Sequence, residues 1–328
     1  MPSWVERPVI DVDMTLPIAQ RYSALPETIV APGKKLLSAV LDEIPSDLKP
    51  VADLVRLRTA NRFHSEAVAV AERVDTDWRN IVLASVSYDM TLAMFGCSTI
   101  ALATKAGPVL ARNMDWWPED LLARGTFQFE HRRNGQLEFM TAGWPGSLGV
   151  VTGMSGRGFA VALNAVTGPE GIDKSGYPVL LHLRRVIEDA KNFDDAVKML
   201  SKTKLVAPAL FTIVGTQNHE RVVIERSPGK HIHRIADHGK PLVTTNDYRL
   251  LFKTKVLGDS EIYQTSCGRF NAMKDFCSRF GPDDNVEDQA LLYVLTDENV
   301  LATITAQHII FRPREQYARV LVPGRLLN

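Results

Sequence analysis

The chain has few cysteines and no net charge, and each shortage excludes a class of protein. Its 328 residues include three cysteines, Cys97, Cys267 and Cys277, an odd number with no C-x-x-C spacing. Neither a disulfide framework nor a thiolate zinc site is therefore expected. The 38 basic residues balance the 38 acidic ones. The chain thus lacks the basic field with which nucleic-acid-binding proteins neutralise phosphates.

Long hydrophobic runs and a targeting signal are missing as well. The uncharged run 139–156 contains five glycines and a proline, which predicts turns and short strands instead of a membrane-spanning helix. The first ten residues include Glu6 and contain no apolar core of a signal peptide, so a cytoplasmic location is expected. An H-E-x-x-H zinc motif, a Walker loop and a dinucleotide-binding fingerprint are also absent, and no metal or organic cofactor is expected.

What the sequence does contain changes in character near residue 96. Before that point, apolar residues recur at helical spacing in 32–41, 47–73 and 76–94, so residues 1–96 are predicted to be a mainly helical segment. After it, short strands predominate, and they are interrupted by helices at 179–190, 193–202, 271–280 and 286–295. The strands are predicted at 98–103, 109–115, 125–132, 137–142, 148–153, 159–165, 209–215, 221–225, 232–235, 242–245, 303–311 and 316–322. Antiparallel-looking strands with paired helices predict an α+β domain over residues 97–328.

The stretch most informative about chemistry is residues 96–117, GCSTIALATKAGPVLARNMDWW. Cys97 begins one strand, and a hairpin turn returns the chain so that Arg112 and Asp115 lie near the end of its partner strand, about 5 Å away. A thiol becomes an effective nucleophile when a nearby cation or base lowers its pKa. No histidine lies near Cys97 in the sequence. One remaining base is the α-amine of Cys97 itself, which would exist only if the Gly96–Cys97 bond were cut, and an inert buried cysteine is the commoner alternative.

Several segments carry a resemblance to a known family. They are GCSTI and RNMDWW in 96–117, KTKLVAPALFTIVG at 202–215, GFAVALN at 158–164, VTTND at 243–247 and IDVDMTLPIAQR at 10–21. Together they resemble the acid ceramidases and N-acylethanolamine-hydrolysing acid amidases, within the choloylglycine hydrolase-like group of N-terminal nucleophile (Ntn) hydrolases. The resemblance implies an αββα sandwich of antiparallel sheets preceded by an N-terminal helical segment.

The resemblance also implies a precursor that cleaves itself between Gly96 and Cys97, after which Cys97 is the N-terminal nucleophile. In that case Arg112 would lie beside the thiolate and the polar head of the substrate, and Asp115 would orient the new α-amine. The two cut parts, 1–96 and 97–328, would stay associated.

Three further residues complete the catalytic set that the resemblance implies. Asn246 would donate its side-chain NH2 to the oxyanion, with a backbone N–H near Asn164 as the second donor, and Arg269 is the best match for a further active-site arginine. Asn164 alone also fits a strand end, and Asn246 alone fits a turn. This chain departs from acid ceramidases in a hairpin one residue shorter, in Ala165 where they have an acidic residue, and in an insertion at 249–263.

The function that this resemblance implies is hydrolysis of a linear amide with an apolar acyl part, of the ceramide or N-acylethanolamine type, without a cofactor. Trp116, Trp117 and Trp144 are the tryptophans expected to line an acyl groove. Transient contact with a membrane or micelle surface would follow from such a substrate. Two alternatives stay open: a related amidase or acyltransferase acting on a bile-salt, penicillin or acyl-amino-acid amide, and a non-catalytic lipid-binding relative.

Overall fold

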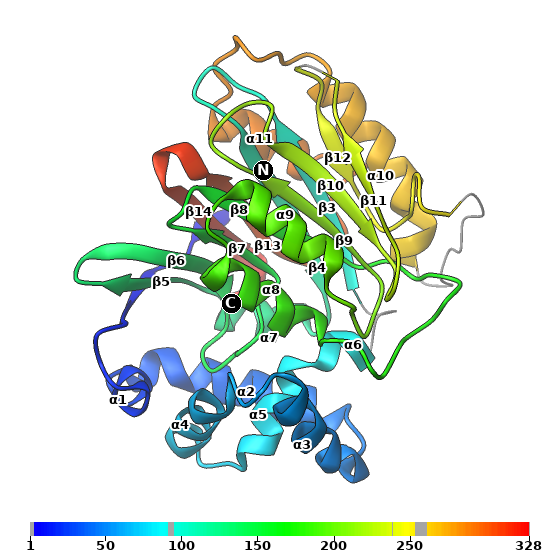
Figure 1. The fold of residues 1–328 in the computed structure, drawn as a ribbon. Helices are drawn as coiled ribbons and strands as arrows, with labels where there is room; N and C mark the ends of the chain where they lie inside the picture. The colour runs from blue at the N-terminus through cyan, green and yellow to red at the C-terminus, as the bar shows by residue number, and fades with distance from the viewer. Residues whose placement is uncertain (1–2, 91–94, 238, 253–260, 328) are drawn as a thin grey trace.

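Two stacked β-sheets form the centre of the computed structural model, which describes residues 3–90, 95–237, 239–252 and 261–327 (Figure 1). Sheet A is antiparallel throughout. In spatial order its strands are β1 (Trp4–Glu6), β14 (Tyr317–Pro323), β13 (Thr305–Arg312), β4 (Val109–Trp116), β3 (Phe95–Leu102) and β12 (Leu242–Thr244). The neighbouring strands β3 and β4 are the hairpin that the sequence predicts.

Sheet B is antiparallel except at one edge, where β2 runs parallel to β5. Its strands in spatial order are β11 (His231–Ile235), β10 (Arg221–Arg226), β9 (Ala209–Val214), β8 (Phe159–Asn164), β7 (Thr152–Ser155), β6 (Gln136–Gly143), β5 (Phe127–Arg133) and β2 (Val9–Asp13). Buried side chains such as Leu110, Met154 and Ile309 pack between the two sheets. This inner layer holds the sheets face to face.

Two pairs of helices cover the outer faces of the sheets. Helices α8 (Val179–Asp189) and α9 (Phe193–Lys202) pack on sheet B, while α10 (Glu261–Cys277) and α11 (Asp288–Leu295) pack on sheet A. The order of layers is therefore helix, sheet, sheet, helix (Figure 1). The prediction of an α+β sandwich of antiparallel sheets is confirmed. Helix α10 begins ten residues before the predicted start at Asn271.

The helices of the N-terminal segment gather in one group beside the sandwich (Figure 1). They are α1 (Ile18–Ser23), α2 (Glu27–Asp42), α3 (Lys49–Arg58), α4 (His64–Val74), α5 (Trp78–Ser85) and the short α6 (Ser87–Met90), with a 3₁₀ turn at Ser46–Leu48. The single helical stretch predicted over 47–73 is interrupted because Ala60 and Asn61 adopt positive φ angles of 51° and 61°. Such left-handed residues end a helix. The predicted helix 76–94 is interrupted at Val86, and its last four residues lie outside the described part of the chain.

The prediction for residues 1–96 missed two strands, and these tie the segment to the rest of the fold. Strand β1 pairs with β14 at the edge of sheet A, and β2 pairs with β5 at the edge of sheet B. A short helix, α7 (Glu119–Gly125), also precedes β5 where a strand start was predicted. Short 3₁₀ turns follow β13 and β14 at Pro313–Glu315 and Gly324–Leu326. The N-terminal segment thus contributes one strand to each sheet.

The N-terminal helices pack closely on the sandwich. At Gly33 in α2, an added Cβ would lie 2.7 Å from the carbonyl oxygen of Pro145, so only glycine permits this approach of the two backbones. Next to it lies a nearly buried ion-pair group: Arg184 of α8 contacts Glu66 of α4 at 3.4 Å and also Glu188. Tyr22 donates a hydrogen bond to the same Glu66 carboxylate.

A buried carboxyl group makes a second link between the two parts. Asp89 of α6 accepts a hydrogen bond from the backbone N–H of Val179, the first residue of α8, at 3.1 Å. Burial raises the pKa of Asp89 from 3.8 to about 7, although the Val179 hydrogen bond acts in the opposite direction. Asp89 is therefore protonated and neutral at mildly acidic pH, and it carries a buried negative charge at alkaline pH.

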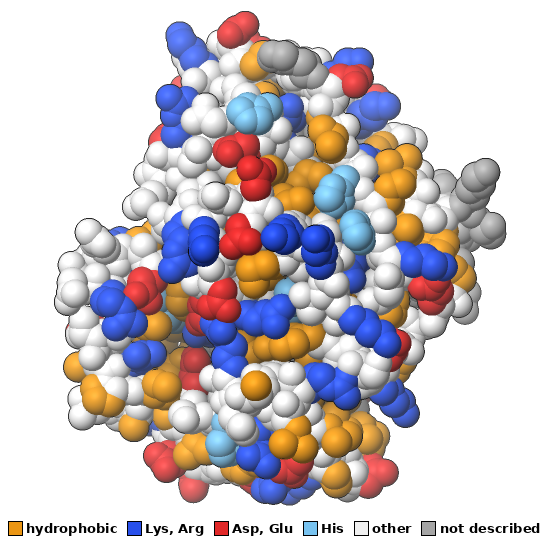
Figure 2. Space-filling view, viewed as in Figure 1, with side chains coloured by type: hydrophobic (Ala, Val, Ile, Leu, Met, Phe, Trp, Pro, Cys, Tyr) orange, Lys and Arg blue, Asp and Glu red, His pale blue; other side chains and the backbone are white. Residues whose placement is uncertain are grey.

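The surface in Figure 2 shows acidic and basic side chains interspersed across one face of the molecule, in keeping with the zero formal net charge. Within the described residues, no helix is both long and apolar enough to cross a bilayer.

The first prediction concerns the Glu66–Arg184 pair. Glu66→Gln should lower the free energy of unfolding by about 2–4 kcal/mol, because it leaves the nearly buried guanidinium of Arg184 without one of its counter-charges. Denaturant unfolding measures the loss. Asp237→Asn, which removes a carboxylate from the exposed Lys240–Asp237 pair, is the matched control and should leave stability unchanged. Equal stability of the two variants would contradict the role given to Glu66.

The second prediction concerns pH. Because the pKa of Asp89 is raised on folding, its contribution to stability is complete below pH 3.8 and is lost as the pH rises through about 7. Between pH 6 and 8 the wild type should lose about 1.4 kcal/mol from this group. Asp89→Asn, which keeps an acceptor for Val179, should lack this part of the decrease when unfolding is followed at both pH values. An identical decrease in the variant would show that other groups cause it.

Candidate active site

The pairing of β3 with β4 positions the candidate nucleophile. Cys97 lies opposite Met114, Gly96 lies opposite Asp115, and Thr99 lies opposite Arg112. Directly paired residues in antiparallel strands have Cα atoms about 4.5–5.5 Å apart. The hairpin thus brings Cys97, Arg112 and Asp115 together, as its sequence spacing predicts. Cys97 is 3% exposed.

The guanidinium of Arg112 is aimed at the thiol. Its Nη2 donates to Cys97 Sγ, and its Nη1 donates to Thr152 Oγ1 of sheet B at 2.6 Å. Arg112 is fully buried, so these contacts fix the direction of its charge. Burial raises the pKa of the Cys97 thiol, while the positive charge of Arg112 opposes that rise. In the uncut chain the thiol is therefore the favoured form, and a proton acceptor is needed before it can attack.

Asp115 has one satisfied and one unsatisfied oxygen. Thr305 donates to Oδ1 at 2.6 Å, whereas Oδ2 is buried and has no hydrogen-bond partner among the residues that the structure describes. Burial raises the pKa of Asp115, and the charge of Arg269 opposes this effect. A buried carboxylate oxygen without a partner is costly. The site can therefore accept one further donor next to Gly96.

Asn246 lies two residues after the end of β12 and contacts the backbone of Cys97. Its Oδ1 accepts from the backbone N–H of Cys97 at 3.2 Å and from Arg269 Nη2 at 2.8 Å, and its Nδ2 donates to the carbonyl of Ala165 at 2.9 Å. Two donors at one end and an acceptor at the other define the orientation of the amide. Since an NH2 group has two hydrogens, one remains after the bond to Ala165.

Arg269 reaches the site from α10, on the other side of sheet A. Its Nη1 donates to the carbonyl oxygen of Cys97 at 2.9 Å and to Ser98 Oγ at 2.7 Å. Burial lowers the pKa of this guanidinium, and the Asp115 carboxylate opposes the shift. The insertion at 249–263 therefore does not move Arg269 away from Asn246.

The side chain of Asn164 connects strands and does not itself bond to the thiol in this structure. Its Oδ1 accepts from Thr99 Oγ1 at 2.7 Å, and its Nδ2 donates to the carbonyl of Thr244 at 3.1 Å. Asn164 on sheet B is thereby joined to β3 and β12 of sheet A. The next residue, Ala165, presents its backbone N–H to Cys97. Its position matches the backbone donor near Asn164 that the resemblance implies, and its role stays a prediction.

Sequence reasoning missed the hydroxyl groups that support this set. Thr305 donates a hydrogen bond to Asp115, although the two residues are 190 positions apart in the sequence. Thr152, on the other sheet, accepts from Arg112. Ser266 accepts from the backbone N–H of Asn246 at 2.9 Å. Single hydroxyl residues in strands and helices carry no motif. Only the tertiary pairing brings them to the site.

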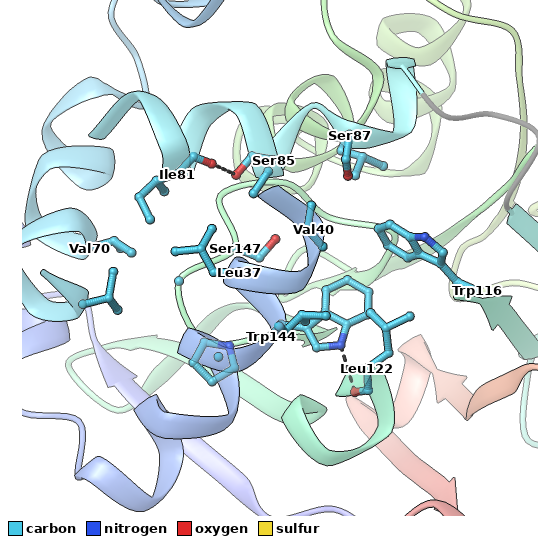
Figure 3. A pocket seen from close by; sticks show the side chains of 17 residues that line it. Leu37, Val40, Val70, Ile81, Ser85, Ser87, Trp116, Leu122, Trp144 and Ser147 are labelled. Carbon is cyan, nitrogen blue, oxygen red and sulfur yellow. Dashed lines mark hydrogen bonds between the residues drawn. The ribbon is translucent and has the colours of Figure 1, made fainter. Parts of the chain in front are cut away.

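The three tryptophans do not line one groove, which corrects the expectation of a shared acyl site. Trp116 and Trp144 are buried, and their rings pack edge to face with their centroids 5.4 Å apart. Both line a void of ≈ 60 Å³ between α2, α5 and the sheets (Figure 3). Trp117 is 41% exposed and lines a different cavity of ≈ 830 Å³. Successive residues of an extended chain point to opposite sides, so Trp116 and Trp117 diverge.

Two larger cavities are present, and one of them reaches the site. The ≈ 830 Å³ cavity extends to Arg269 and is also lined by Glu261, Glu298 and Leu301. A second cavity, of ≈ 340 Å³, lies where α3, α6 and the 172–178 loop meet. Within the described part of the chain, no group of three or more His, Cys, Asp or Glu side chains is placed to hold a metal ion.

Comparison with known proteins supports the resemblance. The chain is 25% identical to the N-acylethanolamine-hydrolyzing acid amidase of Caenorhabditis elegans over 66% of this chain and 66% of that protein. It is 24% identical to an acid ceramidase of Balaenoptera acutorostrata scammoni over 67% of this chain and 63% of that protein. The match therefore spans just under two thirds of the length of each relative.

The fold comparison agrees with these matches. The structure of the Caenorhabditis elegans N-acylethanolamine-hydrolyzing acid amidase ortholog superimposes with a TM-score of 0.54 and 22% identity, covering 66% of this chain and 93% of that one. The Ntn-hydrolase αββα fold is thus confirmed, as is the resemblance to acid ceramidases and N-acylethanolamine-hydrolysing amidases. Residues 102–300, more than half of the chain, match the profile of one family. The chain belongs to the acyl-coenzyme A:6-aminopenicillanic acid acyl-transferase family.

Proposed function

We propose that this chain cleaves itself between Gly96 and Cys97 and then acts as an N-terminal cysteine amidohydrolase. The observation that carries the proposal is the buried, unpartnered Oδ2 of Asp115, directly across the strand pair from Gly96. Cleavage would create an α-ammonium group on Cys97 beside this carboxylate. The new cation would supply the donor that Asp115 lacks, and this match supports a cut at the Gly96–Cys97 bond.

The cleavage follows from the chemistry of the thiol. Cys97 Sγ attacks the carbonyl carbon of Gly96, the C–N bond breaks, and the amine of Cys97 takes up the proton that the thiol lost. The acyl group of Gly96 is then a thioester on Sγ. Water hydrolyses it to the Gly96 carboxylate and returns the thiol.

Turnover of an amide substrate repeats these steps with a different acyl group. The free α-amine of Cys97 takes the thiol proton, and the thiolate, beside Arg112, attacks the substrate carbonyl. The second N–H of Asn246 Nδ2 and the backbone N–H of Ala165 stabilise the oxyanion. The α-ammonium protonates the leaving amine, and water activated by the same α-amine releases the acid.

An N-acyl lipid is the substrate class that we favour. The relatives' names indicate fatty-acyl amide substrates, and the ≈ 340 Å³ cavity has apolar walls that include Val51, Val55 and Val206. Its rim includes Leu54 and Ile172, which are 62% and 49% exposed. Exposed apolar side chains at a cavity mouth suit transient contact with a lipid surface. The ≈ 830 Å³ cavity beside Arg269 suits the polar amine part.

Acyl transfer is the second candidate, because the matching family is described as an acyl-transferase. The thioester on Cys97 is the same in both reactions. In hydrolysis water attacks it, whereas in transfer an amine attacks it and forms a new amide. The two outcomes differ only in the acceptor that reaches the thioester.

After the cut, the parts 1–96 and 97–328 would remain one molecule. The strand pairs β1–β14 and β2–β5 cross between the parts, and so does the Glu66–Arg184 ion pair. These contacts do not depend on the Gly96–Cys97 bond.

The third prediction tests the cut and the nucleophile. Wild-type protein should give two masses, with the second fragment beginning at Cys97, and Cys97→Ala should stay uncut and inactive because it lacks the attacking sulfur. Intact-mass spectrometry and an amidase assay measure both effects. Cys277→Ala removes an equally buried thiol from α10 and should be cut and active. Maturation of Cys97→Ala would refute the mechanism.

The fourth prediction separates the substrate classes. Cut enzyme should hydrolyse ceramide or N-palmitoylethanolamine faster than a conjugated bile acid or a penicillin, because the apolar cavity favours a long acyl chain. Product release is followed by mass spectrometry, with and without an added primary amine. Formation of a new amide in place of the free acid would favour acyl transfer. If no lipid amide reacts, the lipid-amidase proposal fails.

A further inference from the structure

Ser266 connects the candidate oxyanion donor to the helix that carries Arg269. It lies on α10 with no exposed surface. Its Oγ accepts from the backbone N–H of Asn246 at 2.9 Å, and the hydroxyl donates to Asp247 Oδ1 at 2.6 Å. The same oxygen lies 2.9 Å from Thr245 Oγ1. One hydroxyl therefore contacts three consecutive residues centred on Asn246.

The position of Ser266 on its helix couples two parts of the site. Residues three apart on a helix lie on the same face, so Ser266 and Arg269 point toward the same edge of sheet A. Ser266 holds the backbone of Asn246, and Arg269 holds its side-chain Oδ1 at 2.8 Å. A single helix face thus contacts both the backbone and the side chain of Asn246.

The chain beyond Asn246 is anchored from the other sheet. The fully buried carboxylate of Glu225, on β10, accepts from the backbone N–H groups of Arg249, Leu250 and Leu251 at 2.9–3.1 Å. This anchor fixes the loop three residues after Asn246. It does not contact Asn246 itself, whose backbone N–H donates to Ser266 instead.

We propose that Ser266 is a positioning residue that acts through Asn246, holding its amide where the oxyanion forms. The proposal rests on the proposed amidase function. Without the hydroxyl, the N–H of Asn246, which is fully buried, has lost its acceptor, and the loop must move to satisfy it. A displacement of about 1 Å can lower a rate by roughly 100-fold. Losing an oxyanion donor costs roughly 100- to 1000-fold.

The fifth prediction follows for Ser266→Ala. With an N-acyl amide that the wild type hydrolyses, kcat should fall by about 10- to 100-fold while KM changes by less than about twofold, because the oxyanion exists only after attack. The loss should be absent when Ser266→Ala is added to Asn246→Ala, since both changes act on one donor. Steady-state kinetics of the four proteins measure both effects.

Ser201→Ala is the matched control, because it also removes a hydroxyl from a buried helical serine, on α9. The Ser201 hydroxyl contacts Val197 and His233 instead of residues of the site. Its kcat should equal that of the wild type. If Ser266→Ala yields no folded protein, Ser266→Cys keeps the volume with a weaker hydrogen bond and should give a smaller loss of the same kind. Unchanged kcat in the Ser266 variant, or additive losses with Asn246→Ala, would overturn the proposal.

A structural measurement separates this proposal from the proposed function. If the wild type hydrolyses no N-acyl amide, the proposed function fails, and the crystal structure of Ser266→Ala decides the role of Ser266. A displaced Asn246 amide, with its contact to Cys97 lost, supports positioning. An amide that stays in place overturns it.

Discussion

The pairing of β3 with β4 is the interaction on which the site depends. Its register sets Gly96 opposite Asp115 and Thr99 opposite Arg112, so that one hairpin brings a thiol, a cation and a carboxylate within reach of one another. A shift of one residue would turn each side chain to the opposite face of the sheet. Packing on both faces, by sheet B and by α10, opposes such a shift. The core that stabilises the sandwich thereby also fixes the geometry of the site.

Burial gives the few charges of the site their effect. Arg112, Asp115 and Arg269 are each 3% exposed or less, and in such surroundings the interaction between charges is much stronger than in water. Each guanidinium donates several hydrogen bonds. Arg112 donates to Cys97 Sγ and to Thr152. Arg269 donates to Cys97, Ser98 and Asn246. Only one of the two carboxylate oxygens of Asp115 accepts a hydrogen bond from the described residues. Asp115 therefore keeps one buried acceptor that no donor fills within the described residues.

The sequence predicted local features well and distant ones poorly. The β3–β4 hairpin and helices α8 and α9 followed from turn residues and apolar spacing, because their signals lie within a few residues. Asn246 and Arg269 were located through the resemblance alone, since no local pattern links them to Cys97. Thr305 and Ser266 had no signal, because a hydroxyl acquires its role only from tertiary contacts. The edge strands β1 and β2 were missed because they are short and largely exposed. A shared groove for the three tryptophans was predicted wrongly, because residue type does not reveal which way a side chain points.

The two strands that the N-terminal segment contributes have a consequence for a two-chain enzyme. If the Gly96–Cys97 bond is cut, β1 and β2 become strands of one polypeptide completing the sheets of another. Releasing that polypeptide would bare the edge of both sheets at once, and bare edges pair with other chains. A molecule that lost its N-terminal segment would therefore tend to aggregate before it could bind the segment of another molecule. Each mature enzyme would keep the N-terminal segment with which it folded.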